Sequence, residues 1–343
     1  MLRKRIDDEI FLQLIWKFLK AGYLENWQYH KTYSGTPQGG IISPLLANIY
    51  LHELDKFVMK LKSEFDTPGV GQITPEYREL HNEIKRLSHR LTKVTGEERE
   101  MVLAEYKPKR QKLMTIPCTA QTDKKLKYVR YADDFLIAVK GNREDCQWIK
   151  SKLAEFIGDT LKMELSEDKT LITHSSKCAR FLGYDVRVRR SGKIKRGGPG
   201  HVKMRTLNGG VELLVPLNDK IRQFVFTKGV AIQKKDGSMF PVHRKYLVGL
   251  TDLEIVSVYN AELRGICNYY GMASNFCKLH YLAYLMEYSC LKTLASKHKT
   301  SLSKTIDKFN DGTGKWGIPY ETKQGNKRRY FANYADCKGK GPA

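Results

Sequence analysis

The segment KYVRYADDFLIAVKG, residues 127–141, places two adjacent aspartates in the middle of an otherwise apolar stretch. Apolar side chains alternate with smaller or polar ones on both sides of the pair, which is the period of two expected for β-strands. The alternating residues are Val129, Tyr131, Phe135, Ile137 and Val139. Ala132, Asp133 and Asp134 would form a short turn between the strands. The pattern therefore predicts a β-hairpin that carries both aspartates at its tip.

Two carboxylates at a hairpin tip repel each other and lose part of their hydration. A divalent cation offsets both costs, because carboxylate oxygens are the hard ligands that Mg²⁺ prefers. Asp133 and Asp134 are thus candidate metal ligands. An ordinary hairpin with two aspartates in its turn fits the same letters, so these residues alone leave both interpretations open.

The composition favours a folded protein that binds a polyanion. The 343 residues are 41% hydrophobic and 28% charged, which supports a hydrophobic core. The formal net charge of +23 makes nucleic acid the leading partner. A merely basic surface or an anionic membrane is the alternative, although no lipidation motif or basic amphipathic anchor supports membrane binding.

The cysteines and the N-terminus indicate the compartment. The seven cysteines are scattered, and none forms a Cys-x-x-Cys pair or has zinc-ligand spacing with histidine. No secretory signal and no apolar run of transmembrane length is present. We therefore expect a cytoplasmic protein of bacterial type, or an organellar one if it is imported, without a membrane partner.

Helical patterns surround the predicted hairpin. Apolar residues between Ile10 and Leu19 recur at helical spacing, and Asp7 and Asp8 suit the N-terminus of that helix. Charged residues with a narrow apolar stripe at about 70–115 indicate a helical hairpin or a surface insertion. A further amphipathic helix is expected at about 144–161.

Several segments, taken in order, resemble the reverse transcriptases encoded by bacterial and organellar group II introns. The segments are GTPQGGIISPLLANIYLHELD (35–55), YVRYADDFLIAV (128–139), LSEDKTLITH (165–174) and ARFLGYDV (179–186). Residues 259–299 are similar to the maturase domain of that family, which is also called the thumb or domain X. The resemblance covers nearly the whole chain, from about residue 6 to 299.

The resemblance implies an α+β fold of the right-hand polymerase type. Residues 1–205 would form part of the palm, an antiparallel sheet with helices, including the charged insertion at about 70–115. Residues 206–305 would form the helical thumb or maturase domain, and residues 306–343 a basic C-terminal tail.

The resemblance also assigns roles to residues of the predicted hairpin. Tyr131, Ala132, Asp133 and Asp134 would be the catalytic hairpin, with both aspartates at a site for two Mg²⁺ ions. Ala132 is small and would leave room for the primer end. Lys169 would lie near the triphosphate and assist the leaving group, and a solvated lysine is the alternative.

Other matched residues would contact substrates. A turn near the nucleotide and the template would include Pro37, Gln38 and Gly39, together with Tyr131 and Ala132. The primer grip would be Phe181, Leu182, Gly183 and Tyr184, although Phe181 and Leu182 are explained equally well as strand residues of the core.

The helical region after residue 216 offers candidates for RNA binding. The basic candidates are Arg264, Lys292, Lys297 and Lys299. The tyrosines of the same region are expected to pack in the core, as buried tyrosines commonly do. These tyrosines are Tyr269, Tyr281, Tyr284 and Tyr288.

The active site of the family needs a third carboxylate from an earlier strand, which we expect to lie outside this sequence. Asp7 and Asp8 resemble helix-capping acids rather than replacements for it. We therefore expect a fragment that polymerises poorly by itself, although its family is that of RNA-directed DNA polymerases, which are nucleotidyltransferases with maturase activity. The alternative is a non-catalytic RNA-binding splicing factor. The expected partners are group II intron RNA, an RNA template with a DNA primer, and dNTPs, and a homodimer is left open.

Overall fold

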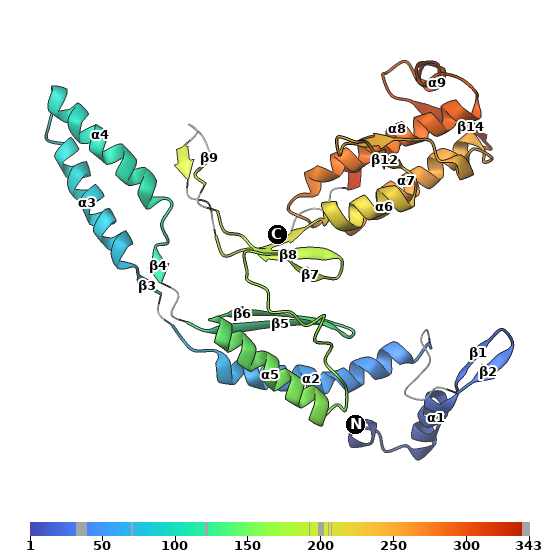
Figure 1. Ribbon diagram of the computed structural model, residues 1–343, viewed down its shortest axis with the longest axis horizontal. Coiled ribbons are helices and arrows are strands. Elements are labelled where there is room, and N and C mark those ends of the chain that lie inside the picture. Colours follow the sequence, from blue (N-terminus) through green and yellow to red (C-terminus); the bar gives the residue numbers. More distant parts are fainter. Residues whose placement is uncertain are drawn as a thin grey trace. The chain divides into compact units, whose positions relative to one another are not determined.

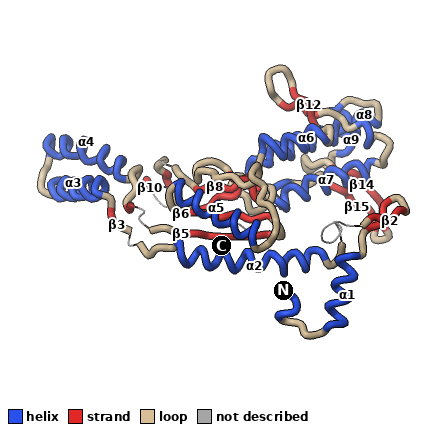
Figure 2. The backbone as a smooth tube through the Cα atoms, turned by 60° about the horizontal axis from the view of Figure 1, so that its bottom comes forward, coloured by secondary structure: helices blue, strands red, loops and turns tan. Residues whose placement is uncertain are grey.

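The computed structural model describes residues 1–31, 40–69, 71–120, 123–191, 193–197, 202–204, 206 and 208–337. Helices and short antiparallel sheets, joined by loops, make up these residues (Figure 2), so the chain has the mixed α+β character that the sequence predicts. The chain divides into two compact units. The first unit comprises Met1–Thr173 and Ser191–Thr206, and the second unit comprises His174–Arg190 and Leu207–Ala343.

The predicted hairpin lies at the centre of the first unit. It consists of β5 (Lys125–Tyr131) and β6 (Asp134–Lys140), and the helices α2 (Ser43–Phe65) and α5 (Arg143–Asp159) pack against it (Figure 1). The buried residues of both helices recur every three or four positions, as an amphipathic helix requires. This core contains Leu51, Leu54, Val58, Leu61, Phe65, Leu126, Ile149, Leu153, Ile157 and Leu161.

Polar side chains fix where two helices of this unit begin. The Asn142 side chain accepts a hydrogen bond from the Asp145 backbone N–H at 2.7 Å, and the Asp145 carboxylate accepts one from the Asn142 backbone N–H at 2.9 Å. This capping box starts α5. Helix α1 (Glu9–Lys20) starts at Asp8, whose carboxylate accepts a hydrogen bond from the Phe11 N–H at 2.9 Å. The prediction that Asp8 is a capping acid is confirmed.

The charged segment at about 70–115 forms two helices. Helices α3 (Pro75–Leu91) and α4 (Gly96–Leu113) lie side by side (Figure 2). The strands β3 (Gln72–Ile73) and β4 (Thr119–Ala120) pair at the base of these two helices (Figure 1). The other strand pairs of the first unit are β1 (Tyr23–Glu25) with β2 (Gln28–His30), and β9 (Lys195–Gly197) with β10 (Val202–Met204).

The second unit begins with a three-stranded antiparallel sheet. Its strands are β7 (Ala179–Phe181), β8 (Tyr184–Val188) and β11 (Val211–Leu214), in the order β11-β8-β7. Strands β7 and β8 lie in the segment His174–Arg190, which belongs to the second unit rather than to the unit that contains β5 and β6.

Helices α7 (Asp252–Tyr269) and α8 (Leu279–Lys297) form the core of the second unit together with smaller elements. Those elements are α6 (Arg222–Thr227), α9 (Leu302–Phe309), β12 (Ala231–Gln233), β13 (Met239–Pro241), β14 (Gly317–Thr322) and β15 (Gly325–Tyr330). Phe309, Trp316 and Ile318 are buried in the same core. The described part of the expected basic tail is thus folded, because these apolar side chains pack against the unit.

A buried arginine connects several elements of the second unit. The Arg244 guanidinium donates to both carboxylate oxygens of Glu262 on α7, at 2.7 and 3.0 Å. The Arg244 backbone N–H donates to the Thr293 hydroxyl on α8, at 3.0 Å. A buried charge is stable only when it is paired and hydrogen-bonded in this way.

None of the helices within the described residues combines the length and the apolar character needed to cross a membrane.

Candidate active site

The tip of the β5–β6 hairpin is a two-residue turn. Tyr131 pairs with Asp134, so Ala132 and Asp133 alone form the turn, and Asp134 is the first residue of β6. Ala132 has a φ of 53°, which is the left-handed region that side-chain-bearing residues enter at a cost. The turn predicted at residues 132–134 is thus present and tighter than expected.

Arg130 holds this turn against helix α2. Its guanidinium donates two hydrogen bonds to the Asp55 carboxylate, both at 2.7 Å. It also donates to the Ala132 backbone carbonyl at 2.7 Å and to the Asn48 side-chain oxygen at 3.0 Å. The Arg130 side chain is only 10% exposed. A planar guanidinium in a bidentate pair fixes distance and orientation together, so the tip cannot easily swing relative to α2.

The electrostatics of Asp55 suit this structural role. Hydrogen bonds from Arg130 hold the pKa of the Asp55 carboxyl below its usual range, against the opposing effect of burial. The Tyr128 hydroxyl donates a third hydrogen bond to the same carboxylate at 2.9 Å, and burial raises the pKa of Tyr128. Asp55 is therefore ionised. Its charge is offset by the Arg130 guanidinium, and both of its carboxylate oxygens already accept hydrogen bonds.

The two aspartates of the tip are in the opposite situation. Asp133 and Asp134 are both exposed, and neither carboxylate forms a hydrogen bond or ion pair within the part of the chain that the structure describes. Four carboxylate oxygens are thus free to bind a ligand at the end of a fixed hairpin. The described residues contain no group of three or more His, Cys, Asp or Glu side chains that could hold a metal ion.

Lys169 lies on the surface of the same unit. It belongs to a single helical turn that is closed by a hydrogen bond from the Thr170 N–H to the Ser166 carbonyl at 2.9 Å. The Lys150 ammonium on α5 donates to the Thr170 carbonyl at 2.7 Å and so attaches this turn to the core. Lys169 is exposed on this turn. The other predicted nucleotide contacts, Pro37, Gln38 and Gly39, lie outside the described residues.

The segment Phe181–Tyr184 forms the turn between β7 and β8 in the second unit. Leu182 and Gly183 both have positive φ, at 46° and 73°. The Tyr269 hydroxyl donates to the Leu182 carbonyl at 2.6 Å, and the Tyr184 hydroxyl donates to the Tyr269 carbonyl. The Tyr270 hydroxyl donates to the Gly183 carbonyl at 3.2 Å. The turn is thus attached to the C-terminal end of α7 by three tyrosine hydroxyls.

The basic residues predicted to bind RNA fall into two groups. The Lys292 ammonium donates to the Pro241 carbonyl at 2.8 Å, and the Lys297 ammonium donates to the Leu250 carbonyl at 2.6 Å and pairs with Asp252 at 2.8 Å. Arg264 and Lys299 are exposed. The prediction that the tyrosines pack in the core is wrong for three of them: Tyr269, Tyr281 and Tyr284 are 55%, 44% and 42% exposed.

Two family models match the chain. Residues 211–335 match the family described as type II intron maturase, and residues 107–186 match reverse transcriptase (RNA-dependent DNA polymerase). Over 338 residues the chain is 72% identical to the group II intron-encoded protein LtrA of Lactococcus lactis subsp. cremoris, which covers 98% of this chain. The chain belongs to the group II intron-encoded reverse transcriptase and maturase family. It spans 56% of the length of the Lactococcus protein.

More distant relatives come from a yeast and another bacterium. The putative COX1/OXI3 intron 1 protein of Saccharomyces cerevisiae is 34% identical over 320 residues, covering 90% of this chain and 36% of the yeast protein. Protein YkfC of Escherichia coli is 32% identical over 190 residues, covering 55% of this chain and 42% of that protein. The reverse transcriptase match contains Asp133, Asp134 and Lys169, and the maturase match contains Arg264 and Lys299.

Sequence reasoning missed the clamp that positions the hairpin tip of this family member. Arg130 shares one face of β5 with Leu126 and Tyr128, because side chains alternate along a strand. A cation on a buried face requires an anionic partner. The alternation of Val129 and Tyr131 indicates the other face of β5, yet these side chains are 50% and 67% exposed, and the partner, Asp55, lies 75 residues earlier, so the pairing was not evident from the sequence.

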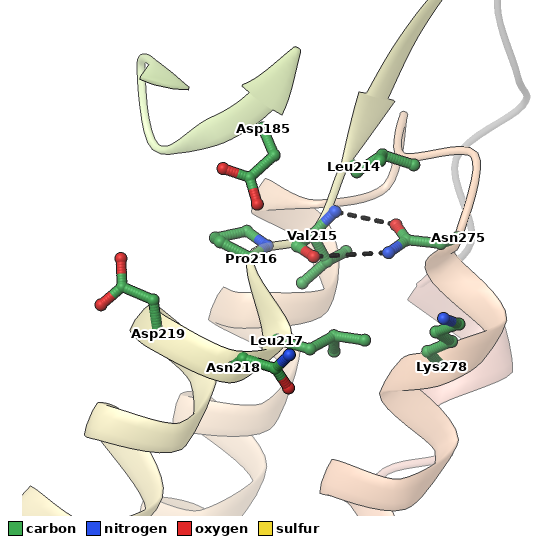
Figure 3. Close-up of a pocket in the computed structure, with 9 residues that line it drawn as sticks. All are labelled: Asp185, Leu214, Val215, Pro216, Leu217, Asn218, Asp219, Asn275 and Lys278. Carbon is green, nitrogen blue, oxygen red and sulfur yellow. Dashed lines mark hydrogen bonds between the residues drawn. The ribbon is translucent and has the colours of Figure 1, made fainter. Parts of the chain in front are cut away.

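A hollow of about 260 Å³ in the second unit is a weaker candidate site (Figure 3). Its carboxylates, Asp185 and Asp219, both pair with Arg180, at 2.8 and 3.0 Å. The Asn275 amide hydrogen-bonds the N–H and the carbonyl of Val215, as the dashed lines show. These polar groups already have partners, so the hollow offers less free chemistry than the hairpin tip.

Proposed function

We propose that this chain carries the catalytic hairpin and an RNA-binding part of a group II intron RNA-directed DNA polymerase with maturase activity. One observation carries the proposal: Asp133 and Asp134 present unpaired carboxylates at the end of a clamped hairpin, within the segment matched by the reverse transcriptase family. The first unit would be part of the polymerase palm. The second unit would be the thumb or maturase domain.

Asp133 and Asp134 would hold the magnesium ions of such an enzyme. Their exposed carboxylates are the donor type that Mg²⁺ prefers, so the residues present fit the ion, while the described residues bring no third carboxylate beside them. When bound, two Mg²⁺ ions supply electrostatic stabilisation of the attacking primer hydroxyl and the departing pyrophosphate.

The remaining residues of the site would position substrates. Arg130 would keep the tip at a fixed place through the Ala132 carbonyl, and the small Ala132 side chain would leave room for the primer end. The exposed ammonium of Lys169 would face the triphosphate of the incoming dNTP. Pro37, Gln38 and Gly39 would contact the nucleotide and the template, and Phe181–Tyr184 would contact the primer strand.

A second candidate function is RNA binding that assists intron splicing without DNA synthesis. The described residues contain no three-carboxylate group, whereas the second unit has a continuous core and the maturase match covers residues 211–335. Group II intron RNA would be the partner in both cases. The two functions differ in whether they depend on Asp133 and Asp134.

Two assays on the same preparations distinguish these functions. We expect weak Mg²⁺-dependent extension of oligo(dT) on poly(rA) by the chain and none by a variant with Asp133→Asn and Asp134→Asn. Excision of a group II intron RNA should be equal for both proteins. The surface substitutions Glu144→Gln and Asp159→Asn, both on α5, are together the charge-matched control. Synthesis by the double variant at the level of the unmodified chain would contradict the catalytic assignment, and failure of the unmodified chain to act on any intron RNA would contradict the maturase assignment.

A further inference from the structure

A row of tyrosines lies on the outer face of helix α8. Tyr281, Tyr284 and Tyr288 follow one another at intervals of three and four residues, so their side chains share one side of the helix. The rings of Tyr281 and Tyr284 have centroids 6.2 Å apart and planes 15° apart, and those of Tyr284 and Tyr288 have centroids 4.7 Å apart. An adjoining side of α8 is buried in the core through Leu282, Leu285 and Met286. The three tyrosine side chains therefore do not belong to the hydrophobic core of the second unit.

The hydroxyls of this row are not held by strong internal hydrogen bonds. The Tyr281 hydroxyl reaches the Met239 carbonyl only at 3.5 Å. The hydroxyls of Tyr284 and Tyr288 form no hydrogen bond within the described part of the chain. A tyrosine that serves packing alone usually has a partner for its hydroxyl when it is buried. Tyr281 and Tyr284, at 44% and 42% exposure, instead present aromatic surface to the solvent.

Two lysines continue the same surface. Lys292 lies four residues after Tyr288 on α8, and its ammonium is 3.6 Å from the centre of the Phe240 ring. The ammonium of Lys234, in the turn after β12, is 4.6 Å from the centre of the same ring. Phe240 is itself 40% exposed. Two cations and an aromatic ring thus lie together at the end of the tyrosine row.

The two ammonium groups repel each other at this place. Burial and the charge of Lys234 lower the pKa of Lys292. Asp236 is the acidic residue of the same turn, and its carboxylate accepts hydrogen bonds from the Ser238 N–H and hydroxyl, at 2.9 and 2.7 Å. The charge of Lys234 acts on the Asp236 carboxylate, but Asp236 forms no ion pair with either lysine within the described residues. An added phosphate would relieve the repulsion between Lys234 and Lys292.

We propose that this surface, formed by Tyr281, Tyr284, Tyr288, Phe240, Lys234 and Lys292, binds an unpaired segment of RNA. Bases would stack on the exposed tyrosine rings, and a backbone phosphate would lie between the two lysines. Sites that bind single-stranded nucleic acid commonly combine aromatic side chains, on which bases stack, with basic side chains. A duplex has no exposed base faces for such stacking. The high positive charge of the chain favours RNA over a second copy of the same chain. The inference rests on the proposed function, because that function makes RNA the partner.

Stacking predicts a specific order among substitutions at the two exposed tyrosines. The probe is a fluorescein-labelled oligouridylate of twelve nucleotides, and its duplex with oligoadenylate is the second probe. Tyr281→Phe with Tyr284→Phe keeps both rings and should bind the single strand as the unmodified chain does. Tyr281→Leu with Tyr284→Leu keeps apolar bulk without rings and should bind it roughly tenfold more weakly for each ring. Binding of the duplex should be the same for all three proteins.

The lysine pair has its own test. Lys234→Gln should weaken binding of the single strand and lower the slope of log affinity against log salt by about 0.7, the value for one phosphate contact on a single strand. Lys304→Gln, a substitution of an exposed lysine on α9, is the charge-matched control and should leave the slope nearly unchanged.

The outcomes separate this proposal from the proposed function. If the unmodified chain binds RNA and the leucine variant binds the single strand equally well, the tyrosine surface is overturned while the proposed function stands. If the unmodified chain binds no RNA, both are overturned. If the leucine variant keeps its RNA affinity but changes the oligomeric state in light scattering, the surface is an interface between copies and the RNA proposal is wrong. A thermal melt of each variant confirms that it is folded.

Discussion

Arg130 and Asp55 lie 75 residues apart in the sequence and form a bidentate pair with both N···O distances at 2.7 Å. The same guanidinium donates to the Ala132 carbonyl in the turn that carries Asp133. The position of the tip relative to α2 therefore depends on one side chain, and several consequences can be measured.

Arg130→Lys should destabilise the first unit by about 2 kcal/mol, because a lysine keeps the charge but cannot make two parallel hydrogen bonds to Asp55 and a third to the turn. Urea unfolding gives the free energy of unfolding of the unit that carries each substitution. Arg180→Lys, in the second unit, is the control, since the Arg180 side chain is 38% exposed and its pairs with Asp185 and Asp219 should contribute less than about 1 kcal/mol. Equal effects of the two substitutions would show that the clamp is no stronger than a surface pair.

The stability contributed by Asp55 should be lost in acid. Its pKa in the folded chain is below the ordinary value, so the contribution is complete above the unfolded pKa of about 3.9 and declines as the pH falls from there through the folded pKa. Unfolding measured between pH 7 and pH 2.5 for the unmodified chain and for Asp55→Asn should give a difference that shrinks below about pH 4. A constant difference across that range would contradict the assigned pair.

Ala132→Gly should stabilise the chain by about 0.5–1 kcal/mol, because glycine accepts the positive φ of this turn without a steric cost. The same substitution at Ala138, an exposed position of β6, should destabilise by a similar amount, because glycine has a larger entropy to lose in a strand. Thermal unfolding of both variants checks the opposite signs. Destabilisation at both positions would indicate that the turn is not strained at Ala132.

Gly183→Ala should be more harmful than Gly209→Ala. Both glycines have positive φ, at 73° and 87°, so both substitutions carry backbone strain. A Cβ at Gly183 would lie 3.2 Å from the Tyr269 hydroxyl oxygen, whereas nothing lies within 4 Å of a Cβ at Gly209. We expect Gly183→Ala to cost about 1 kcal/mol more, through the displaced Tyr269 hydrogen bond to Leu182. Equal costs would mean that α7 does not hold this turn.

Local patterns in the sequence predict the hairpin, the amphipathic helices and the capping role of Asp8, because each of these depends on residues that are near neighbours. Arg130 with Asp55, and Tyr269 with Leu182, depend on chain segments that only the folded structure brings together. For that reason the sequence identified the two aspartates of the tip but not the groups that fix it. The same limit applies to two lysines. The positive charges of Lys292 and Lys297 are evident from the sequence, but only the fold shows that their ammonium groups donate to the Pro241 and Leu250 carbonyls.

For the exposed tyrosines, the sequence pattern predicts a burial that the structure does not show. Their spacing on α8 suits a buried face, yet Leu282, Leu285 and Met286 occupy the core side and leave Tyr281 and Tyr284 outside. Periodicity identifies a helix reliably but not which of two apolar faces is buried when a helix has both.

We propose above that Asp133 and Asp134 bind a divalent metal at the tip of the β5–β6 hairpin, and this binding can be measured directly. Fe²⁺ that replaces Mg²⁺ generates hydroxyl radicals in the presence of ascorbate and peroxide, and these cleave the backbone next to the site. We predict a cut close to residues 132–135 that Mg²⁺ suppresses and that disappears in the variant with Asp133→Asn and Asp134→Asn. Cleavage that is absent from the hairpin, or that persists in this variant, would show that the two aspartates do not bind the metal.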